Sequence, residues 1–363
     1  MRSYNIIGVM SGTSMDGLDI AHFTLSERED KKWDYKINHA KTIPYGDKWR
    51  LRLSKLRNQS SLVFYKTDRF FGQYIGECIA DFLDENSLDA DLIASHGHTI
   101  FHQPHNNLSV QIGDGNSITA MTGIPSVTNF RAMDVIFGGH GAPLSAVGDE
   151  LLFSEYDVCL NIGGFANISS NQNGARIGFD ICPANILFNR IAREFGKDYD
   201  ENGTIAESGK IDYQLLDKLN KIEYYHQSGS KTLGREWIND QFWFNVRESG
   251  ISKEDKMKTL CDHVGSQIGN NIEDLTGGEG SVKRVLATGG GVHNKTLIDH
   301  IKTHTDVEIV IPDDMLVKYK EALIFALLGI LRVKNIDNIY KSVTGADDDV
   351  LAGSLHGNFS DLL

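Results

Sequence analysis

Gly8-Val9-Met10-Ser11-Gly12-Thr13-Ser14-Met15-Asp16-Gly17-Leu18-Asp19 is the stretch that decides the fold of this chain. An apolar run over 4–9 precedes its glycines, hydroxyl residues and carboxylates, and a second apolar run over 20–25 follows them. This order predicts a strand, a tight turn and a second strand. Glycines let backbone N–H groups approach a ligand, and successive N–H groups in such a turn form an anion-binding concavity. The stretch therefore indicates a phosphate-binding loop on a β-hairpin.

Two carboxylates in this stretch, Asp16 and Asp19, would repel a bare phosphate. They fit a site that also holds a divalent cation or a water bound to one, and Asp16 is the candidate Mg²⁺ ligand. The loop is not of the Gly-x-x-x-x-Gly-Lys-Ser/Thr type, because it lacks the lysine and a strand follows it instead of a helix. A plain hairpin turn is the alternative interpretation.

Length and composition are those of a globular protein with two domains. The chain has 363 residues, of which 40% are hydrophobic and 23% charged, and this length suffices for two separate cores. The net charge of −13 argues against nucleic acid or an acidic membrane as the main partner. The apolar runs are too short to span a membrane, no secretory signal is visible, and the four cysteines form no C-x-x-C pair. We therefore expect a cytoplasmic protein with free thiols.

Strand and helix patterns alternate along the chain and occur twice in a similar order. Each half begins with three predicted strands, the first two joined by a glycine-rich turn, and continues with helices and further strands. The repetition predicts an α/β protein with two domains of one architecture, 1–126 and 127–339, and residues 340–363 packed back on the first. The predicted strands are 4–9, 20–25, 33–43, 92–95, 110–115, 124–130, 158–169 (a hairpin), 176–182, 284–288 and 307–311, and the predicted helices are 61–85, 116–123, 183–195, 212–220, 255–275, 294–304 and 319–332.

Two further glycine-rich turns are candidate nucleotide contacts. The turn over 161–167, Asn-Ile-Gly-Gly-Phe-Ala-Asn, joins two predicted strands and is a candidate second phosphate loop. The segment 288–294, Thr-Gly-Gly-Gly-Val-His-Asn, ends a strand and opens a helix. Its glycines allow close approach of a base or sugar, and the helix start favours anions, although a purely structural turn is the alternative. The candidate nucleotide-binding residues in these turns are Asn161, Gly163, Gly164, Gly289, Gly290 and Gly291.

Asp180 stands at the end of an otherwise apolar predicted strand, in Gly178-Phe179-Asp180-Ile181-Cys182-Pro183-Ala184-Asn185. Aspartate is unfavourable within strands. A carboxylate at the C-terminal end of a strand is well placed to act as a general base. The alternative is that Asp180 caps the helix predicted to open at Pro183, and the spacing alone leaves both interpretations open.

Four histidines lie close together within 95–105, namely His96, His98, His102 and His105. Such a cluster can indicate a metal site, but no carboxylate or cysteine lies among them, and the glycine and proline between them predict loop geometry. Polar side chains that face a substrate are therefore favoured over zinc ligands, with His98 as the candidate.

Arg131 and Asp134 follow the predicted extended segment 124–130. Through its guanidinium, Arg131 could bind a substrate carboxylate. An ion pair between the domains is the alternative. The residues alone leave these interpretations of Arg131 open, and Asp134 is a further candidate substrate-binding residue.

Seven motifs of this chain resemble those of the anhydro-N-acetylmuramic acid kinases and occur in the same order as in that family. The resemblance spans nearly the whole chain. The motifs are Ser11-Gly12-Thr13-Ser14-Met15-Asp16-Gly17-Leu18-Asp19, Ser95-His96-Gly97-His98-Thr99, Gly138-Gly139-His140-Gly141-Ala142-Pro143-Leu144, the turn over 161–167, Gly178-Phe179-Asp180, Lys231-Thr232-Leu233-Gly234-Arg235-Glu236 and Thr288-Gly289-Gly290-Gly291.

The resemblance implies the actin-like fold of sugar kinases and heat-shock ATPases, with two RNase H-like domains, an interdomain nucleotide cleft and a homodimer. It implies that ATP phosphorylates the sugar's 6-oxygen while water opens the 1,6-anhydro bridge, giving N-acetylmuramic acid 6-phosphate and ADP in bacterial peptidoglycan recycling. Asp180 matches the catalytic base. Gly12, Thr13, Ser14, Met15, Asp16, Gly17, Leu18 and Asp19 match the ATP-binding loop, and the candidate substrate-binding residues are His98, Arg131, Asp134 and Glu321.

The chain departs from the family pattern at a few positions. Residues 181–185 read Ile-Cys-Pro-Ala-Asn where the family has Thr-Gly-Pro-Gly-Asn, Asn129 stands where Asp is usual, and His98 and His140 stand where Gln is common. The lost glycines affect the backbone around Asp180 rather than the carboxylate itself.

Two other classes of function stay open at this point. An ordinary sugar kinase of the same fold would use Asp180 to deprotonate a substrate hydroxyl, and activity on an anhydro-sugar against other hexoses separates the two reactions. A non-catalytic ATP-binding switch would turn over ATP slowly, whether or not a sugar is present.

Overall fold

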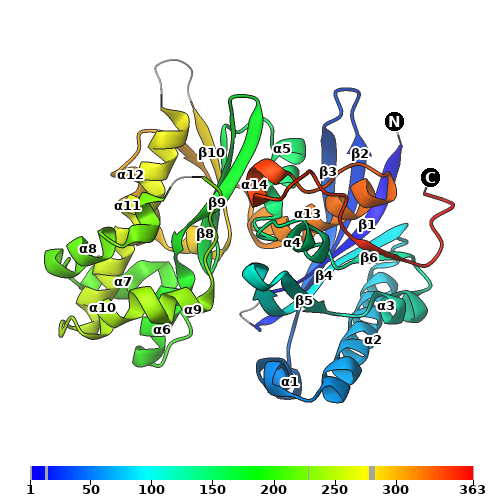
Figure 1. The fold of residues 1–363 in the computed structure, drawn as a ribbon, viewed down its shortest axis with the longest axis horizontal. Coiled ribbons are helices and arrows are strands. Elements are labelled where there is room, and N and C mark those ends of the chain that lie inside the picture. The colour runs from blue at the N-terminus through cyan, green and yellow to red at the C-terminus, as the bar shows by residue number, and fades with distance from the viewer. Residues whose placement is uncertain (1, 13–14, 228, 278–282, 363) are drawn as a thin grey trace. The chain divides into compact units, whose positions relative to one another are not determined.

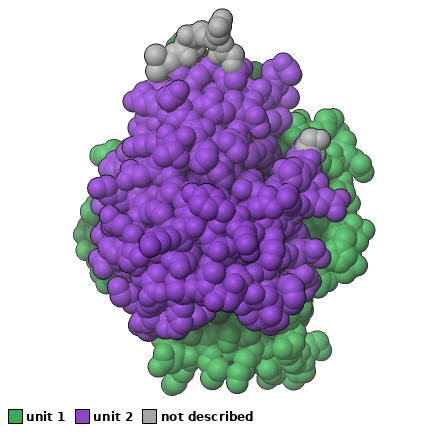
Figure 2. Space-filling model, turned by 90° about the vertical axis from the view of Figure 1, so that its left-hand side faces the viewer, with its two compact units in different colours: residues 1–152, 319–363 green, residues 153–318 purple. Residues whose placement is uncertain are grey.

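The structure is a computed structural model that describes residues 2–12, 15–227, 229–277 and 283–362. Its contacts divide the chain into two compact units, Met1–Leu152 with Tyr319–Leu363 and Phe153–Lys318. The elements are labelled in Figure 1, and the two units are coloured separately in Figure 2. The second unit is thus a continuous segment inserted into the first, and the chain passes between the units twice.

The first unit is built on a seven-stranded sheet. Its first three strands are antiparallel, β4 runs parallel to β1, β6 runs parallel to β4, and β12 pairs antiparallel with β6 at one edge. A further strand, β5, pairs with β4 only. The strands are β1 (Ser3–Ser11), β2 (Gly17–Glu27), β3 (Trp33–Pro44), β4 (Leu92–Gln103), β5 (Leu108–Ile112), β6 (Ser126–Thr128) and β12 (Ser354–His356).

Helices cover both faces of this sheet. Successive residues of β1 point to opposite faces, so neighbouring residues of this strand contact different helices. Ile7 and Val9 share a core with apolar residues of α2 and α3, whereas Gly8 faces α13. A Cβ atom on Gly8 would lie 2.1 Å from the carbonyl oxygen of Ala322, so only glycine allows this approach. The helices of this unit are α1 (Asp47–Lys55), η1 (Leu56–Asn58), α2 (Ser61–Asn86), η2 (Pro104–Asn106), α3 (Gly115–Thr122), α4 (Ala132–Ile136), α5 (Ser145–Leu152), α13 (Asp314–Val333, which spans the unit boundary) and α14 (Lys341–Thr344).

The second unit is built on a five-stranded sheet with the order β11-β10-β7-β8-β9. Again the first three strands are antiparallel, the fourth runs parallel to the first, and the fifth runs parallel to the fourth. Helices α6, α8, α11 and α12 supply most of the helical residues of its core. The strands are β7 (Val158–Ile162), β8 (Phe165–Gln172), β9 (Ala175–Pro183), β10 (Arg284–Thr288) and β11 (Glu308–Val310).

The remaining elements of the second unit are helices and single helical turns. The helix α11 is the longest of them, and Ser252 caps it by accepting a hydrogen bond from Asp255 N. They are α6 (Asn185–Ala192), η3 (Arg193–Phe195), η4 (Glu201–Gly203), α7 (Thr204–Ser208), α8 (Tyr213–Asn220), η5 (Glu223–His226), α9 (Arg235–Trp237), the π-helical turn η6 (Ile238–Phe242), α10 (Trp243–Arg247), α11 (Lys253–Thr276), η7 (Gly290–His293) and α12 (Lys295–Lys302).

The order β3-β2-β1-β4-β6 in the first sheet corresponds to β9-β8-β7-β10-β11 in the second, with the same strand directions. This is the RNase H-like arrangement, and it confirms the predicted α/β fold of two actin-like halves. The predicted repetition of three strands with a glycine-rich first turn is present in both units.

Some predicted boundaries differ from the structure. β4 continues to Gln103, so His96, His98 and His102 lie on a strand where a loop was expected, because pairing with β5 extends it. Pro183 ends β9, and α6 begins at Asn185 instead of at the proline. The contact-based units also divide at 152/153 and 318/319, whereas the predicted domains divide at 126/127 and 339/340. The difference arises because α5 and most of α13 belong to the first unit.

Two findings bear on the environment of the chain. Among the described residues, no helix is both long enough and apolar enough to cross a membrane. Each of the four cysteines is a buried free thiol, which is the state expected from their spacing.

Candidate active site

The first glycine loop lies between β1 and β2, as the sequence predicts. Met15 N donates to Gly12 O over 3.2 Å, and Tyr45 N donates to Asp16 O over 3.2 Å. The side chain of Asp16 is exposed, whereas that of Asp19 is partly buried and accepts a hydrogen bond from the Thr42 hydroxyl. Of the two carboxylates, Asp16 is therefore the more accessible to a ligand. The predicted Thr13 and Ser14 lie outside the described residues.

A buried hydrogen-bond chain joins the end of β1 to β4. The Tyr45 hydroxyl donates to Ser11 Oγ over 2.7 Å, and Ser11 Oγ lies 2.9 Å from His98 Nδ1. All three side chains are buried. Because Ser11 Oγ accepts from Tyr45, its own proton is free to go to Nδ1, which favours the His98 tautomer with hydrogen on Nε2. His98 is thus a buried neighbour of the first loop, and Ser11 and Tyr45 join it in a way the spacing did not reveal.

Arg131 contacts the same strand from the segment after β6. Its Nε donates to His96 Nε2 over 2.9 Å, and its guanidinium also donates to Gly141 O. Asp134 is fully buried and accepts from Gly141 N over 2.7 Å and from Thr344 Oγ1 over 2.6 Å. The two predicted residues therefore hold the segment around Gly141, and the carboxylate of Asp134 does not face solvent.

Glu321 lies on α13, within the electrostatic reach of Arg131 and Asp19. Desolvation by the surrounding protein raises the pKa of its carboxyl, and the charge of Arg131 opposes this increase. Because the residue is exposed by surface area, water reaches the carboxylate and screens these effects. Glu321 thus lies within electrostatic range of Arg131 and of Asp19, all in the first unit.

In the second unit, four polar residues form one row across the sheet. Thr288 of β10 pairs with Asn161 of β7, Asn161 pairs with Asn167 of β8, and Asn167 pairs with Asp180 of β9. Residues directly opposite on neighbouring strands place their side chains on the same face of a sheet. The row brings the second glycine turn, the end of β10 and the predicted base together. Asn167 is a further member of the row that is not among the predicted site residues, because strand register cannot be read from the motif.

The two glycine turns of this unit lie at the same end of its sheet. Gly289 has φ of 82° and a Cβ there would lie 2.5 Å from Asn161 Oδ1, so glycine is required where β10 meets β7. The carbonyl groups of Gly163 and Gly164 accept hydrogen bonds from the first amides of α6. Gly290 is exposed and Gly291 is buried. The turn over 161–167 and the segment 288–291 are thus neighbours at one end of this sheet.

Asp180 is buried, and residues of the segment 224–233 form hydrogen bonds with it. Its carboxylate oxygen Oδ2 accepts from Leu233 N over 2.9 Å, its own N–H donates to Lys231 O over 3.0 Å, and its carbonyl accepts from the Tyr224 hydroxyl over 2.6 Å. A hydrogen bond from a backbone N–H favours the ionised carboxylate. Asp180 lies within β9 and does not cap α6, whose N-cap residue is Ala184. The arrangement is suited to a fixed, ionised general base.

The described residues contain no group of three or more His, Cys, Asp or Glu side chains arranged to hold a metal ion. His96 is buried, and burial together with the nearby charge of Arg131 lowers the pKa of its imidazole well below the ordinary value. His102 Nδ1 lies 3.1 Å from Ser109 Oγ. These histidines are engaged with hydroxyl and guanidinium groups of the same unit. The carboxylate of Asp16 remains a suitable oxygen ligand for Mg²⁺, which binds through one or two carboxylates and several waters.

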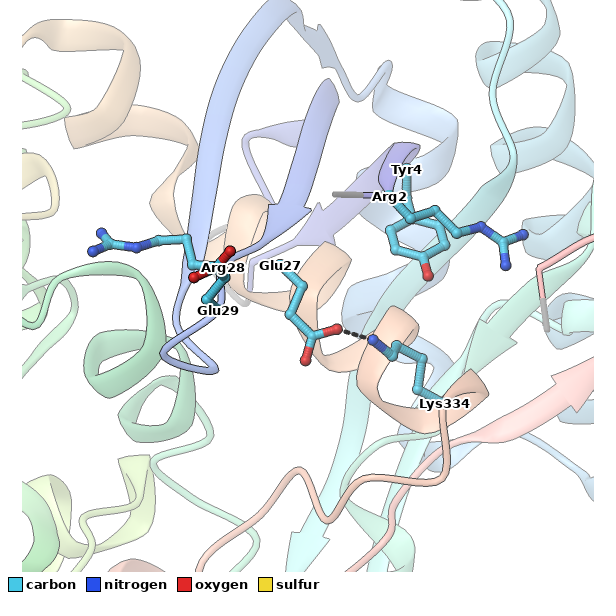
Figure 3. A pocket seen from close by; sticks show the side chains of 6 residues that line it. All are labelled: Arg2, Tyr4, Glu27, Arg28, Glu29 and Lys334. Carbon is cyan, nitrogen blue, oxygen red and sulfur yellow. Dashed lines mark hydrogen bonds and ion pairs between the residues drawn. The ribbon is translucent and has the colours of Figure 1, made fainter.

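A pocket of about 320 Å³ lies elsewhere in the first unit, at the opposite ends of β1 and β2 from the glycine loop. Figure 3 shows the lining residues, with Lys334 paired to Glu27 and the side chains of Arg2 and Arg28 directed to opposite sides. Charges of both signs are mixed here, and none of the predicted site residues line the pocket. It therefore does not alter the assignment of the site.

Similar solved structures have low sequence identity to this chain. One is component A of (R)-2-hydroxyglutaryl-CoA dehydratase from Acidaminococcus fermentans, 13% identical with a TM-score of 0.45, covering 90% of this chain and 97% of that chain. Another is a ROK family glucokinase from Streptomyces griseus in complex with glucose and AMPPNP, 12% identical with a TM-score of 0.41, covering 90% and 99%.

Comparisons of sequence give higher identities than the solved structures do. The family model described as anhydro-N-acetylmuramic acid kinase matches residues 4–358. A relative of that name from Pasteurella multocida (strain Pm70) is 32% identical over 98% of this chain and 97% of its own length. A second, from Vibrio parahaemolyticus serotype O3:K6, is 32% identical over 96% and 97%. With its two RNase H-like units and nearly full-length similarity, the chain belongs to the anhydro-N-acetylmuramic acid kinase family.

Proposed function

We propose that this protein is an ATP-dependent kinase that opens the 1,6-anhydro ring of anhydro-N-acetylmuramic acid and phosphorylates the 6-oxygen, in the recycling of bacterial peptidoglycan. The products are N-acetylmuramic acid 6-phosphate and ADP. Family membership along almost the whole chain supports this reaction. The observation that carries it is the buried Asp180 carboxylate, held by Leu233 N at the end of a polar row across the sheet.

Asp180 acts as the general base in the proposed reaction. It removes a proton from water, whose oxygen bonds to the anomeric carbon as the bond from that carbon to the 6-oxygen breaks. The 6-oxygen bonds to the γ-phosphorus, and the bond from that phosphorus to the bridging oxygen of ADP breaks. A base is needed for the water because the 6-oxygen of the anhydro-sugar carries no proton. The fixed carboxylate supplies the orientation on which such catalysis depends.

The other predicted residues take binding roles in this proposal. The loop over 12–19 and the turns with Asn161, Gly163, Gly164 and 289–291 bind ATP, and Asp16 holds Mg²⁺, which supplies charge neutralisation at the phosphates. Arg131 and Glu321 bind the sugar. His98 and the buried Asp134 help to position this site. His98 does so through its hydrogen bond with Ser11, and Asp134 through the hydrogen bond that it accepts from Gly141 N. We also propose a cytoplasmic homodimer, which light scattering during size-exclusion chromatography would test.

The test of the proposed function is ADP release with anhydro-N-acetylmuramic acid against a panel of hexoses, with wild-type protein and Asp180→Asn. Turnover with the anhydro-sugar and a loss of about 100- to 10,000-fold in Asp180→Asn are expected, while sugar binding measured by calorimetry is retained. In oxygen-18 water, the label should appear at the anomeric hydroxyl. Label in the phosphate, or a variant that keeps most of its rate, would contradict the mechanism.

A further inference from the structure

A short segment, Lys231–Leu233, fixes both the main chain and the carboxylate of Asp180. Lys231 O accepts from Asp180 N over 3.0 Å, and Leu233 N donates to Asp180 Oδ2 over 2.9 Å. The orientation of the carboxylate therefore depends on where this segment lies. Since the segment is irregular and not part of a helix or strand, something other than a hydrogen-bond ladder must hold it.

The side chain of Lys231 supplies that support. Its Nζ donates to Gln227 O over 2.9 Å and to Tyr224 O over 3.2 Å, which are carbonyl groups of η5 and the residue after it. The ammonium also lies 4.8 Å from the ring centroid of Tyr224 and 5.5 Å from that of Phe179, the residue before Asp180. The lysine thus connects the segment, η5 and β9.

The turn η5, whose carbonyl groups accept hydrogen bonds from Lys231, is itself held in place by other contacts. The Tyr224 ring is buried and packs against Trp237 with 5.3 Å between ring centroids. Its hydroxyl donates to Asp180 O over 2.6 Å. The turn η5 is therefore fixed to β9 without Lys231, so that removal of the lysine would release the segment Lys231–Leu233 and leave η5 in place.

We propose that Lys231 is a positioning residue for Asp180: it holds Leu233 N against Oδ2, and so fixes the carboxylate in its ionised form. This inference rests on the proposed function, in which Asp180 is the base. The physical reason is that a backbone N–H bonded to a carboxylate favours the charged form, and its loss favours the protonated acid. The loss also frees the carboxylate to rotate away from the attacking water.

The groups around Asp180 allow its titration to be recognised. Tyr224 on η5 and Cys182 on β9 interact with its charge, and burial raises the pKa of the phenol and of the thiol, so both stay neutral near pH 7. The neighbour on β8, Asn167, does not titrate. Burial lowers the pKa of Lys231 from its ordinary value, and loss of its proton would affect the alkaline side. Tyr224 and Cys182 therefore do not contribute to the acidic side of the pH–rate profile, and the assignment of a shift there to Asp180 rests on direct measurement of its carboxyl.

The test compares wild type, Lys231→Met and Lys231→Arg, with Lys221→Met as the matched control. Lys221 is an exposed lysine that directly follows α8 and pairs with Asp217 of that helix. Lys231→Met should lower kcat by up to about 100-fold, leave the KM values for ATP and sugar near wild type, and move the acidic limb of the kcat profile to higher pH. Lys231→Arg should recover most of the rate, and Lys221→Met should match wild type.

A direct readout separates this inference from the proposed function. The pKa of the Asp180 carboxyl, followed by carbon-13 NMR, should rise in Lys231→Met whether or not the sugar is the substrate. An unchanged carboxyl pKa with a wild-type pH profile would overturn the positioning role. An Asp180→Asn protein that keeps its rate would instead overturn the proposed base. If Lys231→Met does not fold, Lys231→Gln is measured in its place, because its amide retains one donor toward the carbonyl groups.

Discussion

A buried tyrosine forms hydrogen bonds with residues of the first glycine loop. Tyr45 contacts both sides of it, with its N–H on Asp16 O and its hydroxyl on Ser11 Oγ. Burial raises the pKa of the Tyr45 phenol, so that it stays a neutral donor. A buried donor that contacts both Ser11 and Asp16 restricts the conformations of these two residues, and groups that are already held in place lose less entropy when a ligand binds.

Tyr45→Phe should therefore weaken ATP binding and reduce the free energy of unfolding by about 1 kcal/mol, because Ser11 loses the hydroxyl of Tyr45 as a buried partner and keeps only His98 of the two. The measurements are the KM for ATP and urea unfolding. Tyr74→Phe is the matched control, since Tyr74 belongs to the same aromatic cluster with 6.2 Å between its ring centroid and that of Tyr45. Equal KM values for ATP in the two variants would contradict this role of Tyr45.

His263 makes the second unit sensitive to acid. It is fully buried, its Nδ1 lies 2.6 Å from Asn220 Oδ1, and its Nε2 has no hydrogen-bond partner among the described residues. Burial lowers the pKa of the imidazole to about 3. Because the unfolded chain binds this proton at higher pH than the folded protein, stability is lost as pH falls from about 6.5 toward 3, by at most about 1.4 kcal/mol per pH unit.

His263→Leu should flatten this dependence. Between pH 6 and pH 4, the slope of the unfolding free energy against pH should decrease by up to about 1.4 kcal/mol per pH unit, which corresponds to one proton. This holds even though the variant is less stable at neutral pH. Urea unfolding at several pH values gives the slope. Identical slopes for the variant and wild type would show that His263 does not carry the acid sensitivity.

At the scale of elements, α5 and α13 are joined by a buried ion pair. Lys320 Nζ lies 2.7 Å from Asp149 Oδ1, and the side chains are 5% and 3% exposed. Both helices lie at boundaries between the two units. The helix α5 ends at Leu152, at the first boundary, and α13 crosses the second boundary between Lys318 and Tyr319. Such a pair adds little net stability compared with apolar residues, but loss of one partner removes the opposite charge that compensates the burial of the other.

Lys320→Met should accordingly destabilise the protein by about 3–5 kcal/mol. The double variant Lys320→Met/Asp149→Leu should recover much of this loss, because it removes the buried carboxylate as well. Thermal and urea unfolding of both variants measure the effect. A double variant as unstable as the single one would show that the buried charge is not the cause.

At the scale of the whole molecule, the second unit is one continuous segment and the first is not. Phe153–Lys318 contains a complete five-stranded sheet and its own core, whereas the first unit needs β12 and α13 from the C-terminal part of the chain. A segment with its own core and all its strands has the properties of an independently folding domain.

Residues 153–318 expressed alone should therefore fold, with a cooperative thermal transition by circular dichroism. Residues 1–152 alone should not, because Gly8 and Ala94 would face solvent where α13 packs. Joining 1–152 to 319–363 through a short linker should restore folding. Failure of 153–318 to fold would mean that it depends on contacts with the rest of the chain.

The sequence alone predicts most of the strands, the long helices, the two glycine-rich hairpins, the family and Asp180 as the candidate base, but not the short elements α1, α4, α5 and β12. The predicted properties are local: they rest on apolar periodicity, glycine and short motifs. Tertiary packing sets the register that aligns Asn161, Asn167 and Asp180, and the unit boundaries at 152/153 and 318/319. It also decided the burial of Asp134 and the contact of Leu233 with a carboxylate 53 residues earlier. Such contacts depend on how distant segments pack, and no local pattern encodes that packing.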